Sequence, residues 1–171
     1  KNNTLTTKQL ASQLYLSVPT TLKVINDCRS WLKLFNIELN VVRNKGLELA
    51  YNEVSYRLAL KHFILKFDTE TNVEESILFF MPGLDLDAIR RGIMETEKEW
   101  SFEFAEESFN EVLVYASLAI YQNQQENGRK LKFSDEELEM LQKYNEYSFA
   151  EAIFKKLRAH FNMTLPTEEK A

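Results

Sequence analysis

The chain has few of the residues that cross-link a fold or interrupt its regular elements. Its 171 residues include four glycines, three prolines and one cysteine. One cysteine excludes an internal disulfide bond and fits a reducing compartment, so we expect a cytoplasmic protein. So little glycine and proline argues against an all-β or disordered chain and favours long regular elements. No apolar run approaches the roughly 20 residues that span a bilayer, and no signal-peptide pattern is present.

Groups that carry chemistry are also scarce. Two histidines, His62 and His160, stand in the apolar contexts KHFIL and AHFNM, where a structural role is the simpler interpretation. Cys28 falls on a predicted inner stripe and is expected to be a small core residue. No metal-ligand spacing of His and Cys exists, and the scattered glycines form no phosphate-binding loop. We therefore expect no enzyme, no catalytic residue, no metal site and no cofactor.

Charge is distributed unevenly along the chain. Residues 1–52 carry seven basic and three acidic side chains, a net charge of +4, whereas residues 69–171 carry 11 basic and 21 acidic ones, a net charge of −10. A basic head on an acidic body is typical of a polyanion-binding module joined to a separate protein-facing domain. The chain also begins without Met and ends in TEEKA, so we expect a fragment of a longer protein.

The basic segment has the pattern of a helix-turn-helix followed by a β-hairpin wing. A helix is predicted over residues 8–15, and Ser17 is a good N-cap for a second helix with Pro19 in its first turn. After Asn36 the hydrophobic pattern alternates, as in a strand, and Asn44-Lys45-Gly46 predicts a hairpin turn. The buried stripe of the second helix is predicted from residues at steps of four, three and four: Thr21, Ile25, Cys28 and Leu32.

The rest of the chain is predicted to be helical and to divide into three parts. We expect a winged helix-turn-helix over 1–52, a connecting helix and linker over 53–76, and a helical bundle over 77–171 that is truncated at its C-terminus. Residues 68–76 are polar and predict the linker. The apolar run 77–81 is either a buried turn of helix or a contact surface, and we favour burial. The inner residues predicted for the connecting helix are Val54, Leu58, Phe63 and Leu65.

Within the bundle, a helix over 106–122 is predicted, and Ser134 with Glu137 predicts a capping box at the start of a short helix. A last long helix is predicted over 147–161. The inner faces of the two long helices are predicted from Phe109, Leu113, Ala116 and Ile120, and from Phe149, Ile153, Leu157 and Phe161.

The second helix of the motif is the candidate recognition helix, because such a helix enters the major groove with its N-terminal residues against the bases. Hydroxyls near its N-terminus can hold a phosphate, and lysines on the first helix and the wing can contact the DNA backbone. Its predicted outward positions are Val18, Pro19, Thr20, Leu22, Lys23 and Asn26. No arginine lies on this predicted outer face, so the bidentate contact to guanine is absent there. The predicted DNA-binding residues are Lys8, Ser17, Thr20, Thr21, Lys23, Arg43 and Lys45.

The order of these features resembles the Mga/BglG-type bacterial regulators. Their helix-turn-helix domains are followed by phosphotransferase-system regulation domains, or PRDs. Three segments carry the resemblance and together cover 122 of the 171 residues: LTTKQLASQLYLSVPTTLKVINDCRSWLKLFNIEL, NKGLELAYNEVSYRLALKHFI with its Glu53 and Arg57, and FAEESFNEVLVYASLAIYQNQQENGRKLKFSDEELEMLQKYNEYSFAEAIFKKLRAHFNMTLPTEE.

The resemblance implies a transcription regulator that binds double-stranded DNA, dimerises through a helical PRD-like bundle and is controlled by phosphotransfer proteins of the sugar-uptake system. The sequence departs from the family where its regulatory histidine commonly stands, because Tyr115 and Gln122 occupy the matching histidine and arginine positions. Phosphohistidine chemistry needs a histidine, so we expect no phosphorylation site within this chain. Phosphotransfer proteins would act on regions outside it.

Two alternatives to DNA binding remain. The helix-turn-helix could be a packing scaffold within a protein-interaction or dimerisation module. The protein could also be an RNA-binding antiterminator, although the head lacks a sheet of exposed aromatic residues for base stacking. No membrane partner is expected.

Overall fold

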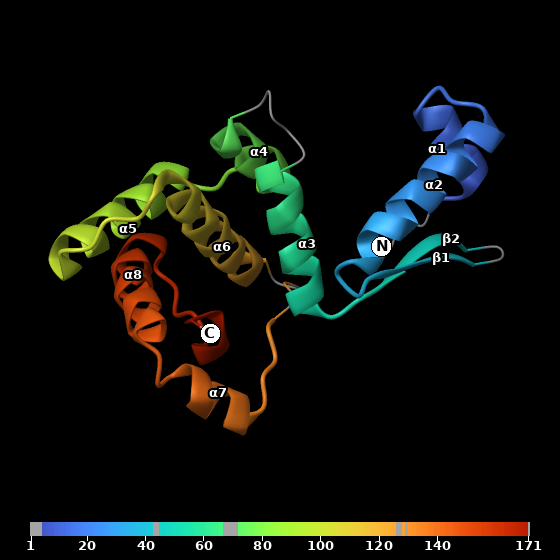
Figure 1. Ribbon diagram of the computed structural model, residues 1–171. Coiled ribbons are helices and arrows are strands. Elements are labelled where there is room, and N and C mark those ends of the chain that lie inside the picture. The colour runs from blue at the N-terminus through green and yellow to red at the C-terminus, as the bar shows by residue number, and fades with distance from the viewer. Residues whose placement is uncertain (1–4, 43–44, 67–71, 126–127, 129, 171) are drawn as a thin grey trace. The chain divides into compact units, whose positions relative to one another are not determined.

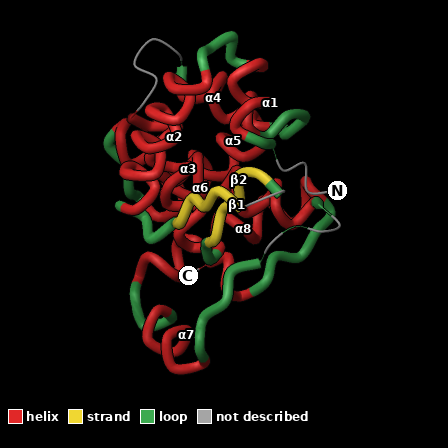
Figure 2. Tube along the Cα trace, turned by 90° about the vertical axis from the view of Figure 1, so that its right-hand side faces the viewer, coloured by secondary structure: helices red, strands yellow, loops and turns green. Residues whose placement is uncertain are grey.

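The computed structural model describes residues 5–42, 45–66, 72–125, 128 and 130–170. The chain forms two compact units, Lys1–Ala59 and Leu60–Ala171. Most of it is helical, and the strands that it describes form one two-stranded sheet, as Figure 1 and Figure 2 show. This confirms the predicted fold class, mainly α with a small hairpin after a helix-turn-helix. In the described part of the chain, no helix is long and apolar enough to cross a membrane.

The first unit begins with two helices, α1 (Thr7–Gln13) and α2 (Val18–Lys33). Ser17 caps α2, because its hydroxyl accepts a hydrogen bond from the backbone N–H of Thr20 at 3.2 Å. Between the helices the backbone turns at Tyr15, which adopts a left-handed conformation with φ of 54°. These capped helices and their tight turn are the predicted helix-turn-helix.

The inner stripe of α2 differs from the prediction in the second half of the helix. Thr21 and Ile25 are buried, but Cys28 is exposed, so its expected place in the core is wrong. The first strand contacts α2 through Arg29, whose side chain binds a strand carbonyl. In the second half of α2, the side that the strand covers is therefore the side that carries Arg29, and Cys28 faces solvent.

The wing consists of β1 (Glu38–Val42) and β2 (Gly46–Ala50), which pair antiparallel with Val42 opposite Gly46. Gly46 has a φ of +97°, and a Cβ added there would stand 2.4 Å from the carbonyl oxygen of Leu5. The same carbonyl accepts a hydrogen bond from the N–H of Leu47 at 3.0 Å. The close approach of the N-terminal segment to the wing therefore requires glycine at position 46.

Helix α3 (Glu53–Lys66) is confirmed as a helix, but two of its predicted inner residues are wrong. Leu58 and Phe63 are exposed, at 39% and 38% of their surface. The helix has almost no amphipathic bias, because its buried positions include polar and charged side chains. Its buried residues are Glu53, Ser55, Arg57, Ala59 and Ile64.

Helix α4 (Val73–Phe80) occupies part of the segment predicted to be a linker. The prediction is wrong for residues 73–76, because Asn72 caps this helix through a hydrogen bond from the backbone N–H of Glu74 at 3.1 Å. Of the predicted linker, residues 68–71 lie outside the described residues. The apolar run 77–81 is divided: its first and last side chains are buried, and the three between them are exposed.

The core of the second unit lies among α5 (Leu86–Trp100), α6 (Glu106–Gln124) and α8 (Asn145–Phe161). Helix α5 packs against both of the others. The predicted inner faces of α6 and α8 are confirmed in the buried side chains of Leu113, Ala116, Ile120, Ile153 and Leu157.

Two short helices complete this unit, α7 (Asp135–Leu141) and the 3-10 helix η1 (Thr167–Lys170). The predicted capping box at the start of α7 is present, since Ser134 and Glu137 bind each other's backbone N–H groups. Helix α8 ends at Phe161, and the left-handed backbone of its C-cap Asn162 turns the chain toward η1.

Candidate nucleic-acid interface

The outer face of α2 carries side chains of mixed character, all of them exposed. It combines two hydrophobic side chains and a proline with a hydroxyl, a lysine and an amide. One lysine on α1, Lys8, and one at the wing, Lys45, are exposed as well. The exposed side chains of this face are the six predicted to point outward: Val18, Pro19, Thr20, Leu22, Lys23 and Asn26.

Thr21 does not belong to this face. Its side chain is fully buried, and its hydroxyl donates a hydrogen bond to the backbone oxygen of Ser17 at 3.0 Å. The prediction that Thr21 contacts DNA is therefore corrected. A β-branched residue at this position faces the core, one turn before Ile25.

Ser17 and Thr20 share one polar cluster at the N-terminus of α2. Their side-chain oxygens lie 2.7 Å apart, and both residues are exposed. The same Ser17 oxygen accepts the capping hydrogen bond from Thr20. The first turn of α2 therefore presents hydroxyl groups beside a helix N-terminus, where the helix dipole favours an anion.

Arg29 is the one arginine of α2, and its side chain is engaged within the head. Its Nε donates to the backbone oxygen of Leu39 on β1 at 3.0 Å, and its Nη1 donates to Oδ1 of Asn26 at 2.5 Å. The guanidinium thus joins the helix to the wing. This role of Arg29 was not predicted from the sequence, because no local pattern indicates which strand carbonyl an arginine ten residues away will meet.

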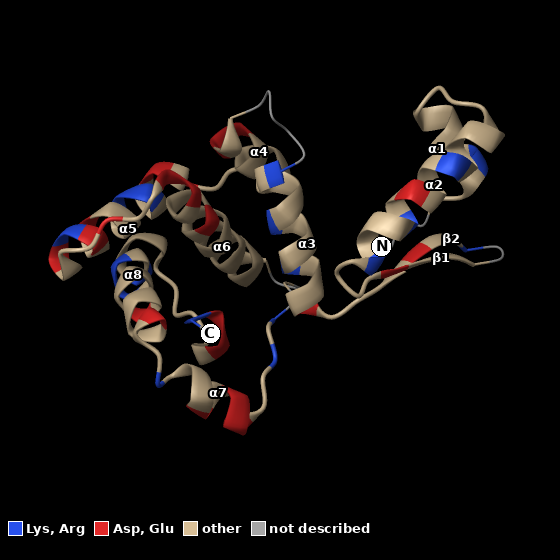
Figure 3. Cartoon of the chain, in the orientation of Figure 1, with Lys and Arg blue, Asp and Glu red and all other residues tan. Residues whose placement is uncertain are grey.

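The wing offers less positive charge than its sequence suggests. The ammonium group of Lys45 lies 3.9 Å from the carboxylate of Glu48, and both side chains are well exposed. Such a pair contributes little in water. Arg43 lies outside the described residues. Figure 3 marks basic and acidic positions along the ribbon of α2 and at the wing.

In the second unit, His160 and Tyr115 form contacts that support the fold. Nε2 of His160 lies 2.7 Å from Oδ2 of Asp85, the residue that caps α5. The hydrogen bond from the backbone N–H of Ala88 lowers the pKa of the Asp85 carboxyl, and the pairing with His160 lowers it further. The ring of Tyr115 lies under the ammonium group of Lys61, 4.8 Å from its centroid. Within the described ranges, no group of three or more His, Cys, Asp or Glu side chains could hold a metal ion.

A helix-turn-helix with a hairpin wing, joined to a separate helical unit, is an arrangement typical of transcription regulators that have a DNA-binding domain and a regulatory domain. Residues 1–67 match the Mga helix-turn-helix domain, and residues 91–171 match the PRD domain. Together the two matches fit a PRD-containing regulator of the Mga/BglG type.

Two curated relatives from Bacillus subtilis (strain 168) support this assignment. The chain is 26% identical over 164 residues to the probable licABCH operon regulator, covering 95% of this chain and 25% of that protein. It is 22% identical over 162 residues to the transcriptional regulator ManR, again covering 95% of this chain and 25% of that protein. The chain spans about a quarter of the length of these relatives.

Proposed function

We propose that this chain is the DNA-binding and first regulatory part of a cytoplasmic transcription regulator without catalytic activity, and that its head binds promoter DNA. The observation that carries this is the outer face of α2, where Ser17, Thr20 and Lys23 are exposed at the N-terminal end of a capped helix. Lys8 and Lys45 supply further positive charge on the same unit.

The head would bind the DNA backbone more strongly than it reads sequence. Lysines and hydroxyls contact phosphates, and such contacts fix register without distinguishing bases. Because Arg29 is held between Asn26 and the wing, α2 offers no free guanidinium to guanine. Val18 and Leu22 can contact a thymine methyl group, which discriminates weakly.

A head of this kind needs a second one to select a site, so we propose that the regulator acts as a homodimer held by its helical body. Linking two heads makes the second binding event intramolecular and raises the apparent affinity when the half-site spacing fits. Control by phosphotransfer proteins, as in the family, would act outside this chain, because Tyr115 stands where the family has histidine.

The test is selection of duplexes from a random pool by the chain, followed by competition with RNA. We expect enrichment of duplexes with two half-sites, which single- and double-stranded RNA displace poorly. Selection of RNA over DNA would favour the antiterminator alternative. Sedimentation measures the dimer, and a monomer at concentrations that saturate the selected duplex would contradict it.

A second candidate function, a protein-interaction head, is favoured by the apolar side chains around the helix-turn-helix turn. Tyr15 is 96% exposed, and four aliphatic side chains near it are also exposed: Leu14, Leu16, Val18 and Leu22. If Leu22→Ser leaves affinity for the selected duplex unchanged but abolishes self-association, these side chains serve a protein contact. We expect the reverse, weaker DNA binding and unchanged association.

A further inference from the structure

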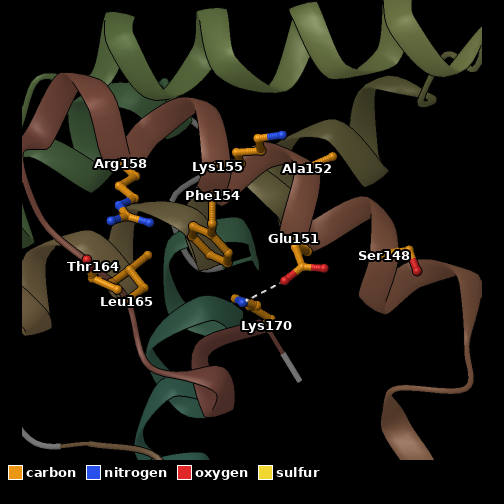
Figure 4. Close-up of a pocket in the computed structure, with 9 residues that line it drawn as sticks. All are labelled: Ser148, Glu151, Ala152, Phe154, Lys155, Arg158, Thr164, Leu165 and Lys170. Atoms are coloured by element: carbon orange, nitrogen blue, oxygen red, sulfur yellow. Dashed lines mark hydrogen bonds and ion pairs between the residues drawn. The ribbon is translucent and has the colours of Figure 1, made fainter.

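The second unit contains a pocket that the proposed DNA binding does not use. It lies between α8 and the segment that returns from the end of that helix through η1, and its volume is ≈ 540 Å³. This is within the range of pockets that bind small molecules, roughly 300–1,000 Å³. Figure 4 shows its lining side chains, which are Ser148, Glu151, Ala152, Phe154, Lys155, Arg158, Thr164, Leu165 and Lys170.

The wall opposite α8 is fixed by two hydrogen-bonded contacts. Nδ2 of Asn123 on α6 donates to Oε1 of Glu169 at 2.9 Å, and Glu169 is buried. The ammonium group of Lys170 lies 2.9 Å from Oε1 of Glu151 on α8. These contacts hold η1 against both helices, so the pocket has a preformed wall.

The pocket is positively charged although the surrounding sequence is strongly acidic. Three of its lining residues are cations and one is an anion, which gives it a net charge of +2. Residues 69–171 as a whole carry a net charge of −10. The side chains of Lys155 and Arg158 form no hydrogen bond or ion pair with any residue that the structure describes. Their neighbour Lys156, by contrast, is paired with Glu99.

The polar lining groups lie on the two sides of the Phe154 ring, as Figure 4 shows. The guanidinium group of Arg158 extends to the side of the pocket where Thr164 and Leu165 lie. The paired Glu151 and Lys170 lie on the other side of the Phe154 ring. One end therefore offers a free guanidinium and a hydroxyl, the middle offers an aromatic ring, and the far end offers a carboxylate and an ammonium group.

We propose that this pocket binds a small phosphomonoester whose carbon part bears hydroxyl groups. A guanidinium group binds phosphate oxygens in a bidentate manner, and the hydroxyl of Thr164 donates a further hydrogen bond. A phosphomonoester carries a charge of about −1.5 to −2 at neutral pH, which matches the pocket. The carbon part lies against the small exposed part of Phe154, which is 9% exposed, and its hydroxyls reach Glu151 and Lys170. The helical body would then respond to a metabolite directly.

The test is titration of the chain with ribose phosphate, measured by calorimetry and by NMR chemical shifts. Ribose, ribonate and inorganic phosphate are the comparison probes. We expect ribose phosphate to bind at least about tenfold more tightly than any of the three, with shifts centred on Arg158 and Thr164. If ribonate binds as tightly as ribose phosphate, the proposal that the pocket recognises a phosphate group is overturned. Equal binding of inorganic phosphate would overturn the role of Phe154 in holding the carbon part.

Matched variants locate the site. Arg158→Gln should weaken ribose phosphate binding by about tenfold or more, and Thr164→Val should weaken it less. Arg91→Gln makes the same substitution at an exposed arginine on α5 outside the pocket and should leave binding unchanged. Equal affinities in Arg158→Gln and Arg91→Gln would overturn the proposal. Arg158 and Arg91 are both exposed, so circular dichroism should show that both variants are folded. Lys155→Gln gives an independent second test of binding at the pocket.

Discussion

Arg57 and Glu53 form a buried ion pair one turn apart on α3, in which Nε of Arg57 donates to Oε1 of Glu53 at 2.9 Å. Only 3% and 6% of the two side chains is exposed. Removing one member of a buried ion pair destabilises a fold by roughly 3–5 kcal/mol. We predict that Glu53→Ala lowers the free energy of unfolding by about that amount, measured by urea denaturation. Lys66→Ala, at an exposed position of the same helix, should change it by less than about 0.5 kcal/mol, and equal effects would refute the role of the pair.

The hydrogen bonds of Arg29 to β1 and Asn26 predict a coupling between α2 and the wing. Hydrogen bonds to charged groups contribute roughly 1.5–3 kcal/mol. Arg29→Gln should therefore speed amide hydrogen exchange in β1 and β2 by about tenfold or more. Lys33→Gln removes the same charge from an exposed position of α2 and should leave the exchange rates unchanged. Similar rates in both variants would mean that the wing is held by other contacts.

Gly46 and Gly83 separate two costs of replacing a glycine. Both have positive φ values, of +97° and +81°, but only at Gly46 would a Cβ meet backbone atoms. Alanine at Gly83 should cost about 1–2 kcal/mol, the cost of a left-handed conformation. Alanine at Gly46 should cost more, because the Leu5 carbonyl must move. Hydrogen exchange near each site measures the local stability. Equal losses at the two positions would contradict the contact between Leu5 and the wing.

The lowered pKa of Asp85 predicts how stability depends on pH. Because the pKa is lower in the folded state, the stabilising contribution is present above the unfolded value of about 3.9 and is lost as pH falls through the folded value. Asp85→Asn keeps a side chain able to cap α5 but cannot ionise, so it should flatten the loss of stability below about pH 4. Asp85→Ala should also lose the cap, at about 1 kcal/mol. Asp87→Asn, at an exposed position nearby, should leave the acid limb of the stability curve as steep as in the parent chain.

The sequence predicts those parts of the fold that depend on local chemistry. Ser17 and Ser134 cap the helices that their hydroxyls predicted, because capping depends on residues only three positions apart. The core faces of α6 and α8 follow a helical period that burial against neighbouring helices confirms. The helix-turn-helix and the hairpin wing were predictable for the same reason.

The errors fall where contacts between distant segments decide the outcome. Cys28 faces solvent because β1 covers a different side of α2, and the burial of Arg57 depends on its partner Glu53. A polar segment was predicted to be a linker, yet it begins α4, because Asn72 caps a helix that hydrophobic residues further along complete. In the candidate interface, the sequence pattern placed Thr21 both on the buried stripe of α2 and among the DNA contacts, and the structure confirms the burial. No local pattern could show that Arg29 binds the wing.

The salt dependence of DNA binding is the most direct test of the central claim. The measurement compares the parent chain, Lys23→Glu/Lys45→Glu and the matched control Lys130→Glu/Lys143→Glu on one selected duplex, between about 50 mM and about 200 mM salt. We predict that affinity falls steeply with salt and that the first variant loses affinity, with a slope smaller by about 0.9 for each phosphate contact removed. The control should behave like the parent. A salt-independent affinity, or identical slopes for all three proteins, would contradict DNA binding by this head.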